Sequence, residues 1–95
     1  MRERTISKLR TLATSLGETA EGSEWHIFGS VDRDEPDAAD IDLMILCQND
    51  GQADALRKAI DPDALLLPLH LALMTFEEAA EVNAICVQRS HAIFP

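Results

Sequence analysis

The sequence predicts an α+β fold in which helices pack on one small mixed β-sheet. Two observations support this prediction. Stretches with the composition of strands, residues 40–47 and 65–74, alternate with stretches whose apolar side chains recur at helical spacing, such as residues 3–16. Turn and stop signals separate these stretches. The chain of 95 residues has the length of one domain, and we find no linker or repeat that would divide residues 1–95.

The first half of the chain predicts a helix followed by two strands. Residues 3–16 form the helix, and Gly17 ends its apolar pattern. Residues 17–23 are expected to be a polar loop. Residues 24–28 (EWHIF) predict a short strand, which leads directly into a Gly-Ser pair.

Gly29 and Ser30 break this strand and open an acidic loop. Ser30 suits the cap of a short helical turn there, and Pro36 would end that turn. Residues 40–47 (DIDLMILC) are the clearest strand of the sequence. Both of its faces are apolar past Asp42, as in a central strand that is covered on both sides.

The next elements are a turn, a helix and a third strand. Residues 49–51 (Asn-Asp-Gly) are typical of a turn, and residues 52–60 predict a short helix that Pro62 closes. Residues 65–74 predict a strand whose odd positions are all leucine and are expected to be buried. Pro68 indicates an edge strand, or a first residue outside the ladder.

The last elements are a helix and a short strand. Thr75 and Glu78 have the spacing of a capping box, and the helix that they begin is expected to run to about Gln88. Residues 91–94 (HAIF) predict a strand that returns to the sheet. The full order implies a small mixed sheet with helices packed on it.

The charge of the chain is strongly negative and unevenly distributed. The net charge of −9 argues against non-specific binding to a nucleic-acid backbone, which requires Lys and Arg. Residues 1–10 are basic, on a helix face that is expected to be solvated. Residues 29–42 hold six acids against Arg33 alone. Acidic groups packed so densely repel one another, and repel phosphate, unless a cation lies among them.

Features of membrane and secreted proteins are not found in the sequence. No stretch approaches the roughly 18 apolar residues of a membrane span, and we find no signal peptide. Cys47 and Cys86 stand in apolar surroundings rather than in a paired framework. We expect buried free thiols in a cytoplasmic protein, in preference to a disulfide or a zinc site.

Two carboxylates recur at strand spacing. Side chains two residues apart on a strand share a face, so Asp40 and Asp42 are expected about 6–7 Å apart along the backbone. Carboxylates so placed can converge on a divalent ion, and their hard oxygens favour Mg²⁺ or Mn²⁺. Gly29 allows a ligand to approach the backbone, and the Ser30 hydroxyl can hold phosphate oxygens. The alternative is that both aspartates are solvated residues at a strand start.

A Gly29-Ser30 pair, nine further residues and then the stretch 40–43 (DIDL) resemble the signature of the polymerase-beta-like nucleotidyltransferases, in particular their minimal (MNT) type. The resemblance covers most of the chain. It implies a nucleotidyltransferase-like (palm) fold and transfer of a nucleoside monophosphate from an NTP, with ATP expected, to a protein or small acceptor. It also implies that Asp40 and Asp42 ligate metal and that Gly29 and Ser30 bind phosphate.

The sequence departs from the pattern of this family at two places. The family usually has a third carboxylate on a later strand, where this sequence has His70. His70 would act as a base or as a ligand for Mn²⁺ or Zn²⁺, and the alternative is a satisfied or half-exposed strand histidine. Family members tend to carry arginines after Gly-Ser, where this sequence has Arg33 among acids. Arg33 is expected to be a solvated loop charge, with contact to phosphate as the alternative, and His26 and His91 are expected to be structural.

The sequence therefore favours an enzyme, a metal-dependent nucleotidyltransferase in which Asp40, Asp42 and His70 are the catalytic candidates. The alternative is a non-catalytic member of the family that binds a partner, such as an antitoxin-like chain opposite an all-helical HEPN-type protein. A protein partner or a second copy is expected in either case, because the chain is too small to close a nucleotide cleft. A third possibility is a module that binds a small metabolite or a second messenger without metal.

Overall fold

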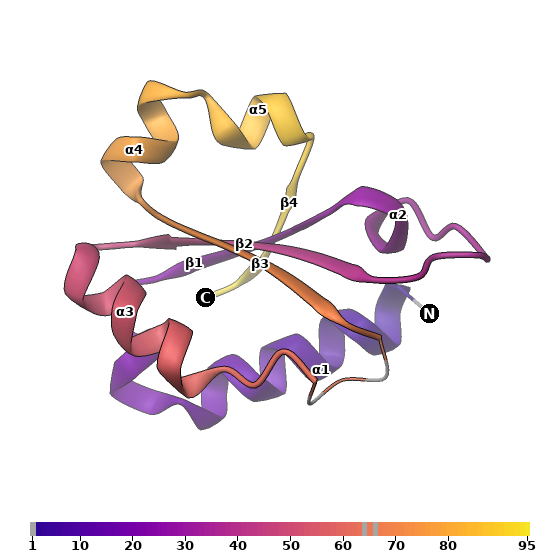
Figure 1. Cartoon of the computed structure of the whole chain (residues 1–95), viewed down its shortest axis with the longest axis horizontal. Coiled ribbons are helices and arrows are strands. Elements are labelled where there is room, and N and C mark those ends of the chain that lie inside the picture. Colours follow the sequence, from indigo (N-terminus) through magenta and orange to yellow (C-terminus); the bar gives the residue numbers. More distant parts are fainter. Residues whose placement is uncertain (1, 64, 66) are drawn as a thin grey trace.

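The computed structural model describes residues 2–63, 65 and 67–95 and has an α+β fold, as predicted. A four-stranded sheet has the strand order β3-β2-β1-β4 (Figure 1). The elements in chain order are α1 (Arg2–Ser15), the 3₁₀ helix η1 (Gly17–Ala20), β1 (Glu24–Phe28), α2 (Gly29–Asp32), β2 (Ile41–Cys47), α3 (Asp50–Ala59), β3 (Leu69–Thr75), α4 (Phe76–Glu81), α5 (Ala84–Gln88) and β4 (His91–Phe94).

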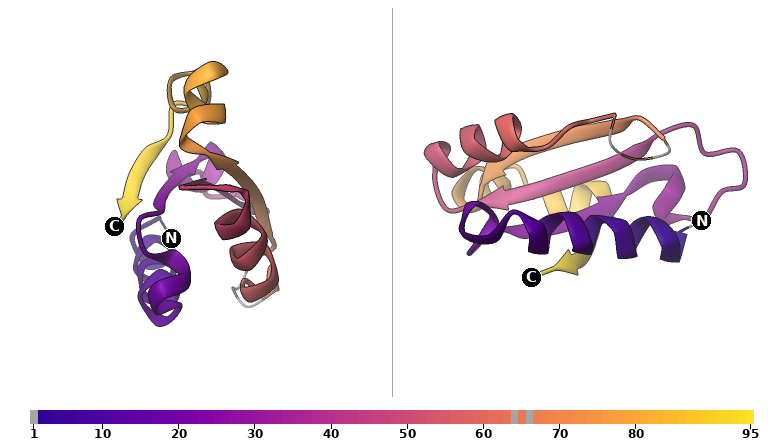
Figure 2. Two further views of the ribbon diagram at one scale, coloured as in Figure 1. Left: turned by 90° about the vertical axis from the view of Figure 1, so that its left-hand side faces the viewer. Right: turned by 90° about the horizontal axis from the view of Figure 1, so that it is seen from below.

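Helices cover both faces of the sheet. Helices α1 and α3 lie on one face, and α4 and α5 lie on the other (Figures 1 and 2). The larger apolar core lies on the side of α1 and α3 and includes Trp25 and Leu43. A smaller core between the sheet and α4–α5 includes Met44 and Leu46. Because consecutive residues of a strand point to opposite faces, β2 contributes to both cores.

Strand β2 is central, as its composition predicts. It pairs with β1 in the antiparallel sense and with β3 in the parallel sense. Its last five residues are buried, which confirms the expectation of a strand covered on both faces. Pro68 immediately precedes β3, and β3 is an edge strand, as the proline indicated. The Pro68 carbonyl accepts a hydrogen bond from the Ile41 N–H at 2.9 Å.

The third strand is shorter and less buried than predicted. It begins at Leu69 rather than at residue 65, because Leu65, Leu67 and Pro68 are not in the ladder, and residue 66 of the predicted strand lies outside the described residues. Among its odd-numbered leucines only Leu69 is buried, whereas Leu71 and Leu73 are half-buried. An edge strand has a neighbour on one side only, so its side chains have fewer contacts to bury them.

The segment 17–23, predicted as a polar loop, contains a 3₁₀ helix and buried residues. Ala20 and Ser23 are both buried. The Ser23 hydroxyl donates to the Ala20 carbonyl at 2.6 Å and accepts from the Trp25 indole N–H at 3.0 Å. The prediction of a polar loop was therefore wrong for residues 17–20, which form a 3₁₀ helix whose Ala20 belongs to the larger core.

The predicted turn at residues 49–51 is instead the start of a helix. The Asn49 side chain accepts a hydrogen bond from the Gln52 N–H at 2.8 Å, so Asn49 caps α3 and Asp50 is its first residue. Asparagine favours turns and helix caps for the same reason, since its side-chain oxygen bonds nearby backbone N–H groups. The tertiary setting here selects the cap.

The helix predicted from Thr75 to Gln88 is interrupted. The capping box is confirmed, because the Thr75 hydroxyl accepts from the Glu78 N–H at 3.1 Å and the Glu78 carboxylate accepts from the Thr75 N–H at 2.9 Å. Asn83 then has a φ of 53°, in the left-handed region. Asparagine tolerates that conformation better than most residues, and the chain divides there into α4 and α5.

The two cysteines differ in their surroundings. Cys47 is buried, as expected, and burial raises the pKa of its thiol. Cys86 is exposed on α5, so the expectation of burial was wrong for this residue. The described part of the chain contains no helix that is both long and apolar enough to cross a membrane.

Candidate functional site

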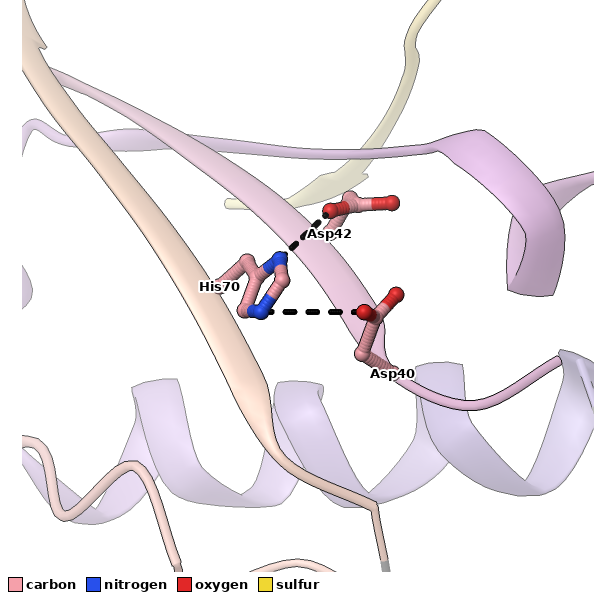
Figure 3. A group of neighbouring side chains, drawn as sticks. All are labelled: Asp40, Asp42 and His70. Atoms are coloured by element: carbon pink, nitrogen blue, oxygen red, sulfur yellow. Dashed lines mark ion pairs between the residues drawn. The ribbon is translucent and has the colours of Figure 1, made fainter.

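The structure brings three of the predicted site residues together. His70 Nδ1 lies 3.5 Å from Asp42 Oδ1, and His70 Nε2 lies 3.6 Å from Asp40 Oδ2 (Figure 3). Each residue offers one ligand atom, and these atoms all lie within 4.8 Å of one another. We call Asp40, Asp42 and His70 the Asp-Asp-His group.

The register of the sheet produces this arrangement. Asp42 on β2 stands opposite His70 on β3 in the parallel ladder, so their side chains share a face. Asp40 lies one residue before the strand, rather than inside it as predicted. Its carboxylate still faces the same histidine, which agrees with the expectation that both aspartates point the same way.

The group lies where the helical cover of the sheet ends. Met44 and Leu46, on the same face of β2 as Asp42, are buried in the core beneath α4 and α5. The side chains of Asp42, Asp40 and His70 are 23%, 33% and 65% exposed. A ligand can therefore reach the group from solvent, while the strands hold two of its members in place.

The electrostatics of the group favour a bound positive charge. Burial raises the pKa of Asp42 above its ordinary value, and the Asp40 carboxylate raises it further. His70 and Arg33 lower the pKa of Asp42 in part. Two carboxylates and an imidazole are a donor set that fits a divalent ion, with the oxygens suited to Mg²⁺ or Mn²⁺ and the nitrogen to transition metals.

Gly29 lies directly beside this group. Its neighbour Phe28 stands opposite Asp42 in the antiparallel ladder of β1 and β2. Gly29 has a φ of 76°, and a Cβ built on it would overlap the Asp42 carboxylate. Only a residue without a side chain fits this bend, because it combines a left-handed conformation with the close approach of Asp42. The predicted proximity of the bend and the acid is therefore found.

Ser30 lies inside the short helix rather than capping it. Helix α2 begins at Gly29, and Phe28 occupies the cap position without a side-chain hydrogen bond. The expectation that Ser30 caps this turn was wrong, because the helical conformation starts one residue earlier. The Ser30 carbonyl accepts from the Glu35 N–H at 3.0 Å, which fixes the acidic loop against the helix.

Arg33 is an exposed residue of the acidic loop. Its Nε donates to Glu35 Oε2 at 2.6 Å. This contact fits the expected solvated loop charge, and the positive charge also lowers the pKa of Asp42. Arg33 is thus close enough to influence the Asp-Asp-His group, and phosphate contact by Arg33 stays a prediction.

A second acid–histidine group was missed by the sequence analysis. Asp32, at the end of α2, lies with its Oδ2 2.6 Å from His91 Nδ1 and its Oδ1 3.2 Å from Arg2 Nη2. The Arg2 Nε also donates to the Asp32 carbonyl at 2.9 Å. The expectation of a solvated basic helix face was therefore wrong for Arg2. No spacing in the sequence connects residues 2, 32 and 91.

His26 has a structural setting, as expected. It is buried, with its Nε2 2.6 Å from Glu24 Oε1 and its Nδ1 3.1 Å from the Ser90 hydroxyl. Together these contacts join the start of β1 to the residue before β4. No third metal-binding side chain joins His26 among the described residues.

The fold and the site define a small α+β domain with an Asp-Asp-His group at the exposed end of its central strand. No known protein family, no curated protein and no solved structure matches this chain.

Proposed function

We propose that this chain is a metal-dependent nucleotidyltransferase with a palm-like fold, of the minimal polymerase-beta-like type. The observation that supports it is the convergence of Asp40, Asp42 and His70 beside the Gly29 bend. The sequence resemblance implies this combination: one carboxylate on β2, a second one immediately before that strand, and a glycine-serine bend at the end of the antiparallel neighbour.

Asp40 and Asp42 would hold Mg²⁺ or Mn²⁺ together with the triphosphate of an NTP, with ATP as the expected donor. The bound ion would supply positive charge at the reacting phosphate. Gly29 would present its backbone to the phosphate oxygens, the Ser30 hydroxyl would donate to them, and Arg33 would add charge from the loop.

His70 takes the place at which the family usually has a third carboxylate. An exposed imidazole next to both aspartates is suited to accept the proton of an acceptor hydroxyl. The acceptor oxygen then forms a bond to the α-phosphorus, the bond from that phosphorus to the bridging oxygen breaks, and pyrophosphate leaves. The acceptor would be a hydroxyl of a protein or of a small molecule.

Binding of ATP with Mn²⁺ or Mg²⁺ tests this proposal by calorimetry and by thermal shift. Nucleotide and metal together should raise the melting temperature, because a ligand that binds only the folded state stabilises it. Asp40→Asn and Asp42→Asn should each abolish the shift. Asp37→Asn removes an exposed acid from the same loop and should leave the shift unchanged.

A chain that binds neither metal nor nucleotide, and whose Asp40 and Asp42 variants match the parent chain in every assay, would contradict the proposal. Transfer of label from α-³²P-ATP to an acceptor, but not from γ-³²P-ATP, distinguishes nucleotidyl transfer from phosphoryl transfer.

One observation favours the alternative of a non-catalytic partner-binding chain. Each ring nitrogen of His70 faces one carboxylate, so a protonated imidazole would offset one of the two negative charges without a metal. The chain also exposes Val82, Ile85 and Val87 on and before α5, near the acidic helix α4. An all-helical HEPN-type partner with a basic rim suits such a surface.

Co-expression with an all-helical HEPN-type protein encoded beside this chain tests the alternative. A stable complex should survive Asp40→Asn and Asp42→Asn, and Val82→Glu together with Val87→Glu should weaken it at least tenfold. If no complex forms, the alternative is wrong. If the complex requires both aspartates, the acidic site is part of the surface that the partner recognises.

A further inference from the structure

The two edges of the sheet are built differently. Strand β4 is four residues long, its register with β1 is shifted by an irregularity next to Trp25, and the Arg10 Nε donates to the Ile93 carbonyl at 2.7 Å. Shortening, irregularity and a charged cover all hinder the pairing of an edge with another strand. Strand β3 is seven residues long (LHLALMT), and His70 is its only ionisable residue.

The outward backbone groups of β3 belong to its odd-numbered residues. The Pro68 carbonyl accepts from β2, so even-numbered residues direct their N–H and C=O groups toward β2. Consistently, the N–H of Leu69 donates away from β2 to the Pro62 carbonyl, and the N–H of Thr75 donates to Glu78. Leu71 and Leu73 therefore direct their N–H and C=O groups to the outer side of the strand.

This pattern is complementary to itself. If a second β3 runs antiparallel about a twofold axis at Ala72, Leu71 of one copy stands opposite Leu73 of the other. In an antiparallel ladder, two opposite residues that both face the partner strand exchange two hydrogen bonds. The two Leu71–Leu73 pairs would therefore form four bonds, and the two Ala72 residues would be a non-hydrogen-bonded pair at the centre.

We propose that two copies of this chain associate through the outer side of β3, in this register, to form a continuous eight-stranded sheet. The pairing places no like charges opposite each other, because the acids of the chain lie outside β3. It also covers the half-buried side chains of Leu71 and Leu73. His70 would stand opposite Met74 of the second copy, so each copy would border the Asp-Asp-His group of the other.

A disulfide at the twofold axis tests the register. Opposite residues of a non-hydrogen-bonded antiparallel pair have Cα atoms about 4.5 Å apart, within the range that a disulfide spans. Ala72→Cys, made with Cys86→Ser to remove the exposed native thiol, should give a covalent dimer on mild oxidation. Met74→Cys in the same background is the control and should stay unlinked, because each Met74 faces His70 of the other copy.

Removal of one outward donor tests the hydrogen bonds. Leu73→Pro removes an N–H that faces away from β2, and edge strands accept proline at such positions. Light scattering should show a dimer for the parent chain and for the side-chain control Leu73→Ala. Leu73→Pro should be monomeric at the same concentration, with the far-ultraviolet dichroism of a folded protein.

A parent chain that is monomeric at 100 µM and an Ala72→Cys variant that stays unlinked would overturn the proposal. So would a dimer that links through Met74→Cys rather than Ala72→Cys, because its register would differ. A dimer that persists in Leu73→Pro and forms no disulfide in Ala72→Cys would use another surface, and this result would also overturn the proposal. The Asp40 and Asp42 variants test nucleotide binding separately, so a failure of the dimer can be distinguished from a failure of the proposed function.

Discussion

Two groups of the same residue types, aspartate and histidine, have different surroundings in this molecule. The carboxylate of Asp32 is 4% exposed and contacts the Arg2 guanidinium and the His91 imidazole. In the Asp-Asp-His group the two carboxylates are farther from their histidine, at 3.5 and 3.6 Å, and are open to solvent. Arginine contacts the first group directly, whereas Arg33 acts on the second only through its charge.

The difference between the two groups lies in their charge balance. Asp32 has one negative charge, and Arg2 balances it without any ligand. Asp40 and Asp42 have two negative charges, and the nearest positive side chain is a histidine that is charged only below its pKa. A buried acid with a permanent partner stabilises the fold. The neighbouring Asp40 carboxylate instead raises the pKa of Asp42, and such a pair of acids attracts a cation. We expect the first group to be structural and the second to bind a ligand.

The largest effect should come from breaking the Asp32 group. Asp32→Ala should lower the free energy of unfolding by about 2–3 kcal/mol, because the hydrogen bonds that Arg2 and His91 make to this carboxylate are lost. Urea unfolding followed by circular dichroism measures this change. Asp37→Ala, at an exposed position of the same loop, should change stability by less than about 0.5 kcal/mol. Equal losses in the two variants would show that the Asp32 contacts contribute nothing.

Replacement of Asp42 should have a smaller effect on the free energy of unfolding, and of opposite sign. Its pKa is raised in the folded state, so the folded chain binds more protons than the unfolded chain as the pH rises above 3.8. As the pH rises above 3.8, the titration of Asp42 therefore lowers the stability of the parent chain. Asp42→Asn lacks this contribution.

Metal-free Asp42→Asn should accordingly be more stable than the parent at neutral pH, by up to about 1 kcal/mol. Urea unfolding at a series of pH values, in a buffer with a chelator, checks the sign. A variant that is less stable than the parent at neutral pH, or whose difference from it is independent of pH between 3 and 7, would contradict the proposed charge imbalance.

The smallest effect should come from Arg33. Its positive charge lowers the pKa of Asp42, so Arg33→Gln should raise that pKa further. The pair of Arg33 with Glu35 is exposed, and its loss should change stability by less than about 0.5 kcal/mol. Arg57→Gln removes a comparable exposed pair from α3 and is the control. An NMR titration of the Asp42 carboxyl carbon measures this pKa. The same pKa of Asp42 in both variants would contradict the prediction.

The central part of the fold could be predicted because its signals are local. The apolar run of β2 and the capping box at Thr75 each depend on residues that are neighbours in the sequence. The break at Asn83 and the helix start after Asn49 could not be decided in this way. Asparagine is compatible with a turn, a cap and a left-handed residue, and packing selects among them.

The two acid–histidine groups also show that local signals can be predicted from the sequence and that contacts between distant elements cannot. The sequence indicated that Asp40 and Asp42 share a face, because two residues of one strand fix their own geometry. It also suggested His70 as the third member, through the resemblance of the surrounding motif. The contact of Asp32 with both Arg2 and His91 depends on how α1, α2 and β4 pack. The periodicity of the sequence does not predict that packing.

The contacts of Asp32 also have a consequence for the order in which the chain folds. Arg2 leaves the ribosome before Asp32, and His91 follows Arg2 by 89 residues. While the nascent chain grows, β1, β2 and β3 can pair, but the buried carboxylate lacks one of its two partners until β4 emerges and joins β1. One contact of the helix that carries Ser30 therefore forms only after β4 has been made.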